Sequence, residues 1–303
     1  MSHLLHFAAV MACCLAAVRP LARARWVRHM PRTALMLWQT IGVTFELSIL
    51  GLLGTMVFAP DNQGLVPGLA QILSDPEAVS VRMSGLVFAG LTGLFVVVRL
   101  TAAALSIRHT RLTRRRHRHL LDLVTGTDAS LPGVDILDHP AAAAYCLPGT
   151  DERIVITTGA LQLLDHTQLT TVLAHERAHL RQRHDLVVLP LESWRRLLPK
   201  NPLLEEAIGA VHLLLEMSAD DACRRRFPGT DLAAALARFS GSPHTLATPA
   251  GGLGVADTAV AARAERLLTP TRPGVRARLS ALVLATLAVI LLATPLSLFV
   301  LPV

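Results

Sequence analysis

Charged residues are scarce in this chain of 303 residues: aspartate, glutamate, lysine and arginine together make up 17% of it. A soluble domain usually carries about 25% charged residues, so the shortage argues against a soluble globular protein. Hydrophobic residues reach 52%, and the mean hydropathy is +0.47. The composition therefore indicates a membrane protein.

Cysteine is also rare, and its placement excludes two kinds of scaffold. The chain has four cysteines, which show neither the paired spacing of a cysteine zinc site nor a disulfide framework: Cys13, Cys14, Cys146 and Cys223. The first two lie in an apolar run, where they are expected to face lipid or another helix. For the other two we expect a reducing compartment.

Aromatic residues amount to only 4% of the chain, although its net charge is +7. The basic residues are mostly arginines that flank apolar segments, with few aromatics among them. This pattern fits membrane topology better than nucleic-acid binding, so no direct nucleic-acid partner is expected. The run Arg114-Arg115-Arg116-His117-Arg118-His119 could bind a nucleic acid, but contact with anionic lipid is the preferred interpretation.

Four apolar stretches predict the membrane spans: about 4–18, 33–59, 83–107 and 279–301. The first is short for a crossing that needs about 20 residues, so a cleaved signal peptide is the alternative. Signal peptides carry positive charge before the apolar run, whereas here the arginines follow it, which favours a retained span. Glu46 and Arg99 interrupt the second and third stretches, and the sequence leaves open whether they pair.

The arginines also predict the orientation of the chain. They cluster at 19–32, 108–118 and 272–278, whereas the loop at about 60–82 has few. Because arginines near the ends of spans favour the cytoplasmic side, we expect both termini and that loop to lie outside. The segment between the third and fourth spans is then cytoplasmic.

The residues His175, Glu176 and His179 form the pattern H-E-x-x-H. On an α-helix the two histidines share one face and can bind one metal ion, while Glu176 can reach a water molecule on that metal. Two imidazole ligands beside a general base are the arrangement of zinc peptidases. Asp165 followed by Gln168 predicts a capping box at the start of this helix. The pattern also arises by chance, so a third ligand is needed.

A second helix, at about 203–226, offers Glu216 and Asp220 on one face. Glu216 stands among apolar residues, where an isolated carboxylate needs a partner. As a third zinc ligand it would leave the fourth position for water. Asp220 could accept the second ring N–H of a ligating histidine and fix its tautomer.

The other elements of this segment are short. Strands at about 142–147 and 153–157, joined by a tight turn, are predicted ahead of the metal helix. Short helices are expected at 231–239 and 256–268. The loop between them, 241–254, could cover the active site, but a plain connector is preferred. Residues 193–198 look amphipathic and fit either the membrane surface or burial in the domain.

His175-Glu176-Arg177-Ala178-His179, followed by Glu216-Met217-Ser218-Ala219-Asp220, resembles the H-E-x-x-H … E-x-x-A-D signature of small gluzincin-type membrane peptidases. These include the CAAX-prenyl and HtpX-type proteases and the BlaR/MecR-type antibiotic-sensor peptidases. The strand pair before the metal helix resembles theirs, and three spans before the domain with one after it are most similar to the BlaR/MecR layout. Because the sequence stops at Val303, the resemblance implies a short form without the penicillin-binding sensor domain, for which direct β-lactam sensing is not expected.

The resemblance implies that His175, His179 and Glu216 bind Zn²⁺ and that Glu176 is the general base. Asp220 would support a ligating histidine.

An oxyanion-stabilising side chain is not readable from the sequence. Arg263 is a candidate for contact with the transition state or the substrate, and Arg266 and His184 are further candidates. The strand at 142–147 could pair with an extended substrate.

The predicted fold is a mainly α membrane protein with four transmembrane helices and an inserted cytoplasmic α+β domain, a minimal gluzincin-like zinc peptidase. Its parts are three membrane helices in 1–107, the peptidase domain in 108–278 and a C-terminal membrane helix in 279–303. We expect a multi-pass plasma-membrane protein whose partners are the lipid bilayer and a protein or peptide substrate.

The expected activity is zinc-dependent endopeptidase cleavage on the cytoplasmic side. The resemblance alone implies a regulatory role, the cleavage of a cytoplasmic transcriptional repressor or of the protein itself. One alternative is an HtpX-like quality-control protease that acts on membrane proteins. Another is a non-catalytic signal transducer in which zinc only stabilises the domain. Glu176 argues against the last, because a structural zinc site needs no base beside it.

Overall fold

The computed structural model describes residues 2–57, 74, 83–127, 131–241, 257–269 and 274–300. Two compact units make up the chain. The first contains Met1–Ala104, Ser193–Ala207 and Pro273–Val303, and the second contains Leu105–Glu192 and Ile208–Arg272. Except for Ser74, the loop expected at 60–82 lies outside the described residues, as does most of the connector expected at 241–254.

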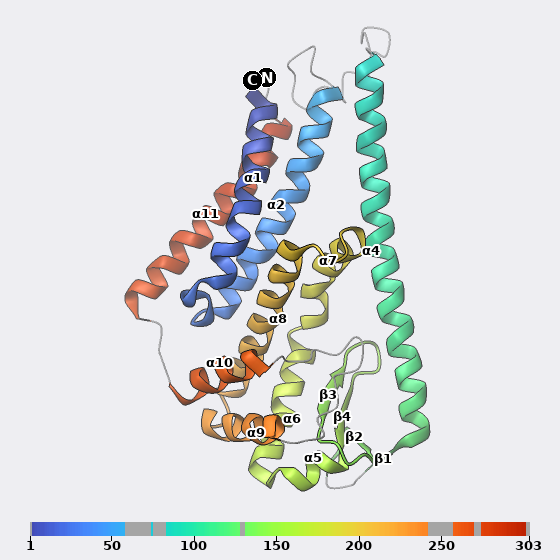
Figure 1. Ribbon diagram of the computed structural model, residues 1–303, viewed down its shortest axis with the longest axis vertical. Helices are drawn as coiled ribbons and strands as arrows, with labels where there is room; N and C mark the ends of the chain where they lie inside the picture. Colours follow the sequence, from blue (N-terminus) through green and yellow to red (C-terminus); the bar gives the residue numbers. More distant parts are fainter. Residues whose placement is uncertain are drawn as a thin grey trace. The chain divides into compact units, whose positions relative to one another are not determined.

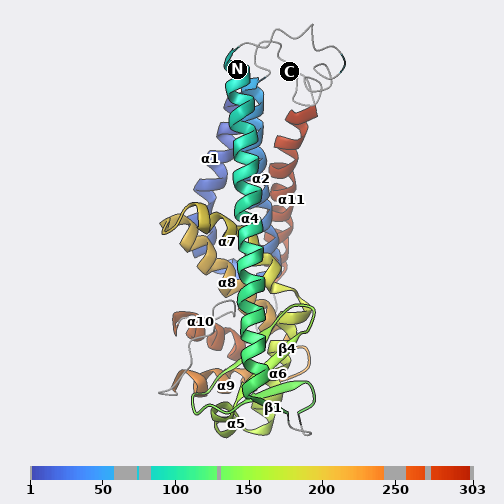
Figure 2. The same ribbon diagram turned by 90° about the vertical axis from the view of Figure 1, so that its right-hand side faces the viewer.

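The first unit is built from long apolar helices (Figures 1 and 2). They are α1 (Ser2–Arg23), the short 3-10 helix η1 (Arg25–Arg28), α2 (Pro31–Val57), the first part of α4 (Met83–Val124) and α11 (Val275–Val300). Helices α1, α2 and α11 pack side by side. Within the described residues, four helices are long and apolar enough to cross a membrane: His3–Arg23, Pro31–Val57, Gly85–Val124 and Arg278–Ser297. Each of the four stretches predicted as spans overlaps one of these helices.

The contact between α1 and α2 depends on a glycine. A Cβ atom placed on Gly51 would overlap the ring of Phe7, which is completely buried. Small residues let the backbones of membrane helices approach closely. A larger side chain at Gly51 would therefore displace Phe7 and separate the two helices.

Glu46 on α2 and Arg99 on α4 form an ion pair, which answers a question that the sequence left open. The indole N–H of Trp194 donates to the same carboxylate oxygen at 2.8 Å, and the Arg99 guanidinium lies over the Trp194 ring, 4.1 Å from its centre. Trp194 belongs to the last turns of α7 (His184–Leu197), the helix that includes the stretch expected to be amphipathic. Ser193 of this helix is buried whereas Arg195 is exposed.

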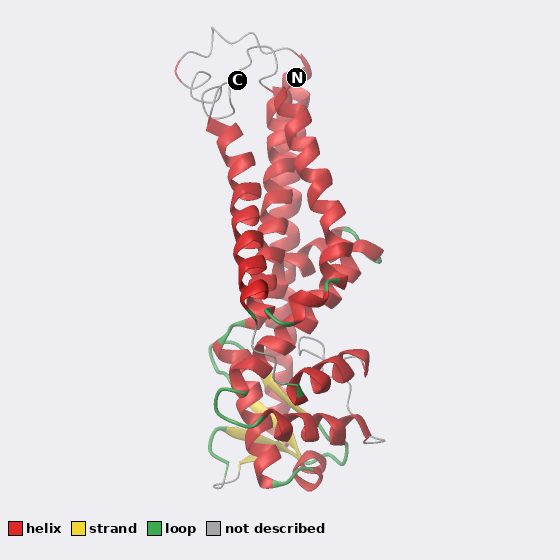
Figure 3. Cartoon of the chain, turned by 90° about the vertical axis from the view of Figure 1, so that its left-hand side faces the viewer, coloured by secondary structure: helices red, strands yellow, loops and turns green. Residues whose placement is uncertain are grey.

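The second unit contains a small sheet, which Figure 3 shows in yellow. Its strands are β1 (Thr125–Thr127), β2 (Val134–Leu137), β3 (Ala144–Leu147) and β4 (Arg153–Thr157), in the order β1-β2-β4-β3. The antiparallel β3–β4 pair confirms the predicted hairpin. Strands β1 and β2 were not predicted, because strands of three and four residues are too short to show a recognisable alternation of apolar and polar residues.

Helix α6 (His166–Arg181) lies at the centre of the second unit. Leu173 and Leu180 on one side of it join a buried cluster with Ile156 of β4. Val172 joins a second cluster with Leu232 of α9 (Gly229–Gly241) and Leu267 of α10 (Asp257–Leu268). The helix is therefore held between the sheet and two later helices. The unit also contains α5 (Thr158–Leu163) and the greater part of α8 (Pro202–Cys223).

One helix is longer than the sequence predicted. The third apolar stretch was expected to end at residue 107, whereas α4 continues without interruption to Val124. It includes the arginine run 114–118. No glycine or proline occurs between Leu94 and Val124, and arginine and leucine are good helix formers. The loss of hydrophobicity ends the apolar stretch but does not end the helix.

Candidate metal centre

The helix that carries the H-E-x-x-H residues begins with the predicted capping box. The Asp165 side chain accepts a hydrogen bond from the backbone N–H of Gln168 at 2.9 Å. The Gln168 side chain accepts one from the backbone N–H of Asp165 at 3.3 Å. These two bonds satisfy N–H groups that a helix start otherwise leaves free. From this fixed start, His175 and His179 fall one turn apart on a buried face.

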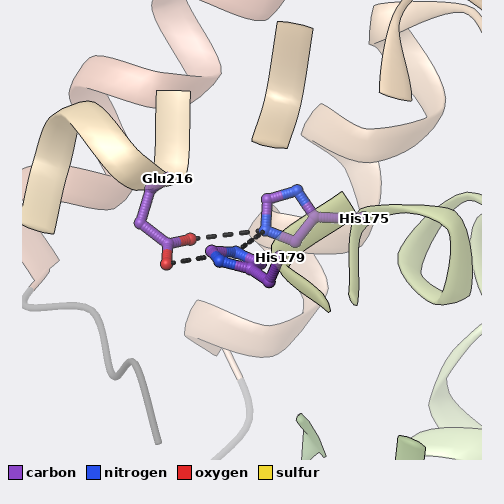
Figure 4. A group of neighbouring side chains, drawn as sticks. All are labelled: His175, His179 and Glu216. Carbon is purple, nitrogen blue, oxygen red and sulfur yellow. Dashed lines mark hydrogen bonds and ion pairs between the residues drawn. The ribbon is translucent and has the colours of Figure 1, made fainter. Parts of the chain in front are cut away.

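The two histidines meet Glu216 from α8, as Figure 4 shows. Nε2 of His175 lies 3.0 Å from Nε2 of His179 and 3.3 Å from Oε2 of Glu216. Nε2 of His179 lies 3.4 Å from Oε1 of Glu216. Tetrahedral zinc with bonds of about 2.0–2.2 Å holds neighbouring ligand atoms about 3.3–3.6 Å apart. The two distances to Glu216 lie in this range and the distance between the histidines is shorter, so the three side chains converge closely enough to bind a single metal ion.

Glu216 is placed by the apolar residues around it. Its neighbours Leu214, Leu215 and Met217 are at most 2% exposed, and Glu216 itself is 6% exposed. A carboxylate costs free energy in such surroundings unless it is paired with a charge or binds a metal. Burial alone would raise the pKa of Glu216, but His179 and Arg263 hold it well below its usual range. The carboxylate is therefore ionised and ready to act as a ligand at neutral pH.

Asp220, one turn after Glu216, lies behind His175. Its Oδ1 is 3.1 Å from Nδ1 of His175, so the ring nitrogen facing the other ligands is Nε2. Burial lowers the pKa of His175, but Asp220 and Glu216 outweigh it and raise the value to about 9. A metal ion would have to compete with a proton for this ring.

Arg263 reaches the cluster from α10. Its guanidinium donates to Asp220 at 2.7 Å and 2.9 Å and lies 2.8 Å from Glu216. Burial opposes the charge of Arg263, but Asp220 and Glu216 raise its pKa above the ordinary value. Arg263 thus balances two buried carboxylates. Its role in contact with a substrate stays a prediction.

His184 and Arg266, the two other candidates for oxyanion contact, have different neighbours from Arg263. Nδ1 of His184 is 2.8 Å from Nδ1 of His179, on the side of that ring turned away from Glu216. Arg266 donates to Asp221 at 2.8 Å and is part of a separate ion pair.

Glu176 lies next to a residue that the sequence analysis did not select. The thiol of Cys146, on β3, lies beside the Glu176 carboxylate. Burial raises the pKa of the Cys146 thiol, and the negative charge of Glu176 raises it further. Burial likewise raises the pKa of Glu176, whose side chain is partly exposed, and the charge of Glu216 adds to the effect. No local pattern could have revealed this contact, because β3 and α6 meet only in the folded unit.

The metal cluster and the apolar helices are features of a membrane metalloprotease, and the comparisons with known proteins agree with this class. Residues 110–198 match the sequence model of peptidase family M48. That stretch includes His175, Glu176 and His179 but ends before Glu216, whose place in the site rests on the geometry. The apolar helices, the cluster and the family match together support a membrane metalloprotease.

A particular relative points the same way. Over 146 residues the chain is 29% identical to the Protease HtpX homolog of Methanothermobacter thermautotrophicus. The aligned region covers 48% of this chain and 48% of the relative, so the chain spans about half the length of the curated relative that it matches. No solved structure matches. Neither match names a BlaR/MecR-type peptidase, and that narrower resemblance stays a prediction.

Proposed function

We propose that this protein is a membrane-embedded zinc endopeptidase. The proposal is carried by one observation, the convergence of His175, His179 and Glu216 beside Glu176. Three protein ligands with a fourth position left for water are typical of catalytic zinc sites, whereas structural sites use four protein ligands. A non-catalytic transducer would also have no use for Glu176 at this point.

The chemistry assigned to the chain is proton transfer. A zinc ion held by the three ligands would supply Lewis acidity, which polarises a peptide carbonyl and makes a water molecule acidic at about pH 7. Glu176 accepts a proton from this water as the oxygen attacks the carbonyl carbon. It then gives the proton to the amine that leaves, so the carboxylate is restored. Its raised pKa makes it a better proton acceptor near neutral pH.

The substrate is proposed to lie along β3. Among the described strands, β3 stands at one end of the sheet and pairs only with β4. Cys146 of β3 contacts Glu176, so the strand passes directly beside the base. An extended peptide that adds to the free edge of β3 would carry its backbone past the metal ligands.

Two classes of substrate suit this chemistry. The resemblance to BlaR/MecR-type peptidases favours regulatory cleavage of a cytoplasmic transcriptional repressor or of the protein itself. The similarity to a relative named Protease HtpX homolog favours quality control of membrane proteins about equally. Both proposals require the metal-binding unit to face the cytoplasm from the plasma membrane.

The activity is tested with Glu176→Gln, which keeps the size of the side chain and removes its basicity. Cleavage of dye-quenched casein by the zinc-loaded protein in detergent should fall by at least about 100-fold, the usual scale for a general base. Zinc content and melting temperature should not change. Glu152→Gln is the matched control, because Glu152 is exposed in the turn between β3 and β4. Full activity in Glu176→Gln would mean that this residue is not the base.

The substrate class is tested in cells. Proteomes of cells that carry the wild type or Glu176→Gln would be compared for cleavage products that disappear. One or two lost products from a soluble regulator or from the protein itself would support the regulatory role. A broad rise in damaged membrane proteins would support quality control.

A further inference from the structure

A second histidine lies directly behind one of the metal ligands. His184, the first residue of α7, places its Nδ1 2.8 Å from Nδ1 of His179. Both rings are buried, at 2% and 5% exposed. At this separation one nitrogen must carry a proton and the other a lone pair. The direction of that hydrogen bond decides which nitrogen of His179 is free to bind a metal.

The backbone takes an unusual path to bring His184 to this position. Helix α6 ends at Arg181, and Arg183 then adopts a left-handed conformation with φ of 50°. Residues other than glycine rarely adopt it, since the side chain crowds the backbone. The turn is held by a bond from the N–H of Arg183 to the carbonyl of Leu180 at 3.1 Å. It directs the first side chain of α7 back onto His179.

A chain of hydrogen bonds fixes the proton positions from the outside inward. The backbone carbonyl of Ser218 only accepts, so the Gln182 amide turns its nitrogen to it, at 3.4 Å. The amide oxygen of Gln182 then accepts from the Ser218 hydroxyl at 2.7 Å and faces Nε2 of His184 at 3.2 Å. Because an amide oxygen cannot donate, Nε2 of His184 must carry the proton.

The proton position on His184 in turn determines the tautomer of His179. A neutral His184 with its proton on Nε2 has a lone pair on Nδ1, and this lone pair can only accept from Nδ1–H of His179. His179 then has its own lone pair on Nε2, the nitrogen that lies near His175 and Glu216. This is the tautomer that a metal ligand needs.

We propose that His184 is a positioning residue for His179, fixing its ring and its metal-binding tautomer through a relay that runs from Ser218 by way of Gln182. The inference rests on the proposed function, because it requires a metal at the cluster. His175 has a carboxylate, Asp220, behind it, whereas His179 has a neutral acceptor. A neutral acceptor holds the ring without adding a further negative charge to a site that already contains Glu216 and Asp220.

The test compares metal binding by the full-length protein in detergent with Leu or Asn at position 184. His184→Leu removes the acceptor and should weaken zinc binding about 10- to 100-fold, measured by competition with a chelator. It should also change the visible absorption spectrum of the Co²⁺-substituted protein, which reports ligand geometry. His184→Asn can place its amide oxygen near the former Nδ1, so affinity and spectrum should stay close to those of the wild type. His166→Leu is the control, since His166 is exposed at the start of α6.

Each outcome of these measurements supports or overturns the positioning role of His184. Wild-type affinity in His184→Leu, or an equal loss in His184→Asn, would overturn the positioning role while leaving the proposed function intact. A wild-type protein that binds neither zinc nor Co²⁺ would overturn both. If His184→Leu does not fold, Gln182→Met decides instead. It keeps His184 but removes the acceptor for Nε2 of His184 together with the two bonds to Ser218, and it should shift the Co²⁺ spectrum in the same direction.

Discussion

Arg263 donates two hydrogen bonds to Asp220, at 2.7 Å and 2.9 Å, and both side chains are almost fully buried. A third contact, 2.8 Å long, joins the same guanidinium to Glu216. Both carboxylates belong to α8, whereas the arginine comes from α10. One cation therefore links the two helices and balances the charge of a metal ligand together with that of the residue behind His175.

Removing this cation should destabilise the protein strongly. Arg263→Met keeps much of the side-chain length but leaves two buried carboxylates without their counter-ion, which typically costs about 3–5 kcal/mol. The melting temperature, followed by tryptophan fluorescence in detergent, should fall accordingly. Excess zinc should recover part of the loss, because a ligand that binds the folded state stabilises it.

Arg266→Met is the matched control for that experiment. Arg266 pairs with Asp221, whose side chain is 34% exposed, so solvent screens the pair. Its loss should cost no more than about 1 kcal/mol. Equal effects of the two substitutions would show that Arg263 contributes packing rather than charge balance.

The metal content can be predicted from the same cluster. The purified protein should bind about one zinc ion per chain, and either His179→Ala or Glu216→Gln should reduce the zinc content sharply, because each removes a ligand. Elemental analysis of protein dialysed against a weak chelator would measure it. Unchanged zinc in His179→Ala would place the metal elsewhere. Glu205→Gln serves as the control, because this glutamate lies on α8 outside the cluster.

A third prediction concerns the ion pair between Glu46 and Arg99. Glu46→Gln keeps an acceptor for the Trp194 indole but leaves Arg99 without its anion, in a segment apolar enough to span a membrane. Arg99, which is 11% exposed, then lacks its anion in an apolar segment and the protein should be destabilised, whereas replacing both partners by neutral groups often costs little. The double variant Glu46→Gln/Arg99→Gln should therefore melt closer to the wild type than either single variant. Additive losses in thermal melts would mean that the two charges act independently.

The parts of the molecule that were predictable from sequence are those whose signal is local. Asp165 and Gln168 predicted the start of α6 because both halves of a capping box lie within one turn. His175 and His179 shared a face for the same reason. Glu216 stood out because it is a lone carboxylate in an apolar helix, although its distance to the histidines could not be read from sequence.

Contacts between distant segments gave no such signal. The Cys146–Glu176 contact depends on how β3 packs beside α6, and the bond between Gln182 and Ser218 depends on how α8 packs against the end of α6. His184 was named only as a candidate for oxyanion contact, which stays a prediction. Its place behind His179 depends on the left-handed turn at Arg183, which the sequence does not reveal.

The last prediction is the orientation of the chain in the membrane. The arginine clusters at 19–32, 108–118 and 272–278 should lie together on the cytoplasmic side. Each arginine at the centre of a bilayer costs roughly 2.5–3.5 kcal/mol on the insertion scale, so these clusters cannot be absorbed into spans. Helix α1, the candidate span over His3–Arg23, should cross as well and leave the N-terminus outside.

Reporter fusions would check this arrangement. A fluorescent reporter after Arg118 should be active, because it folds in the cytoplasm, and an alkaline phosphatase fusion at the same point should be inactive. A phosphatase fusion in the loop at 60–82 should be active. If α1 did not cross, the N-terminus would be inside while the other three spans kept their direction, so a fusion at the N-terminus separates the two cases. Phosphatase activity after Arg118 would reverse the whole topology and remove the possibility of cutting a cytoplasmic repressor, even if the metal centre were active.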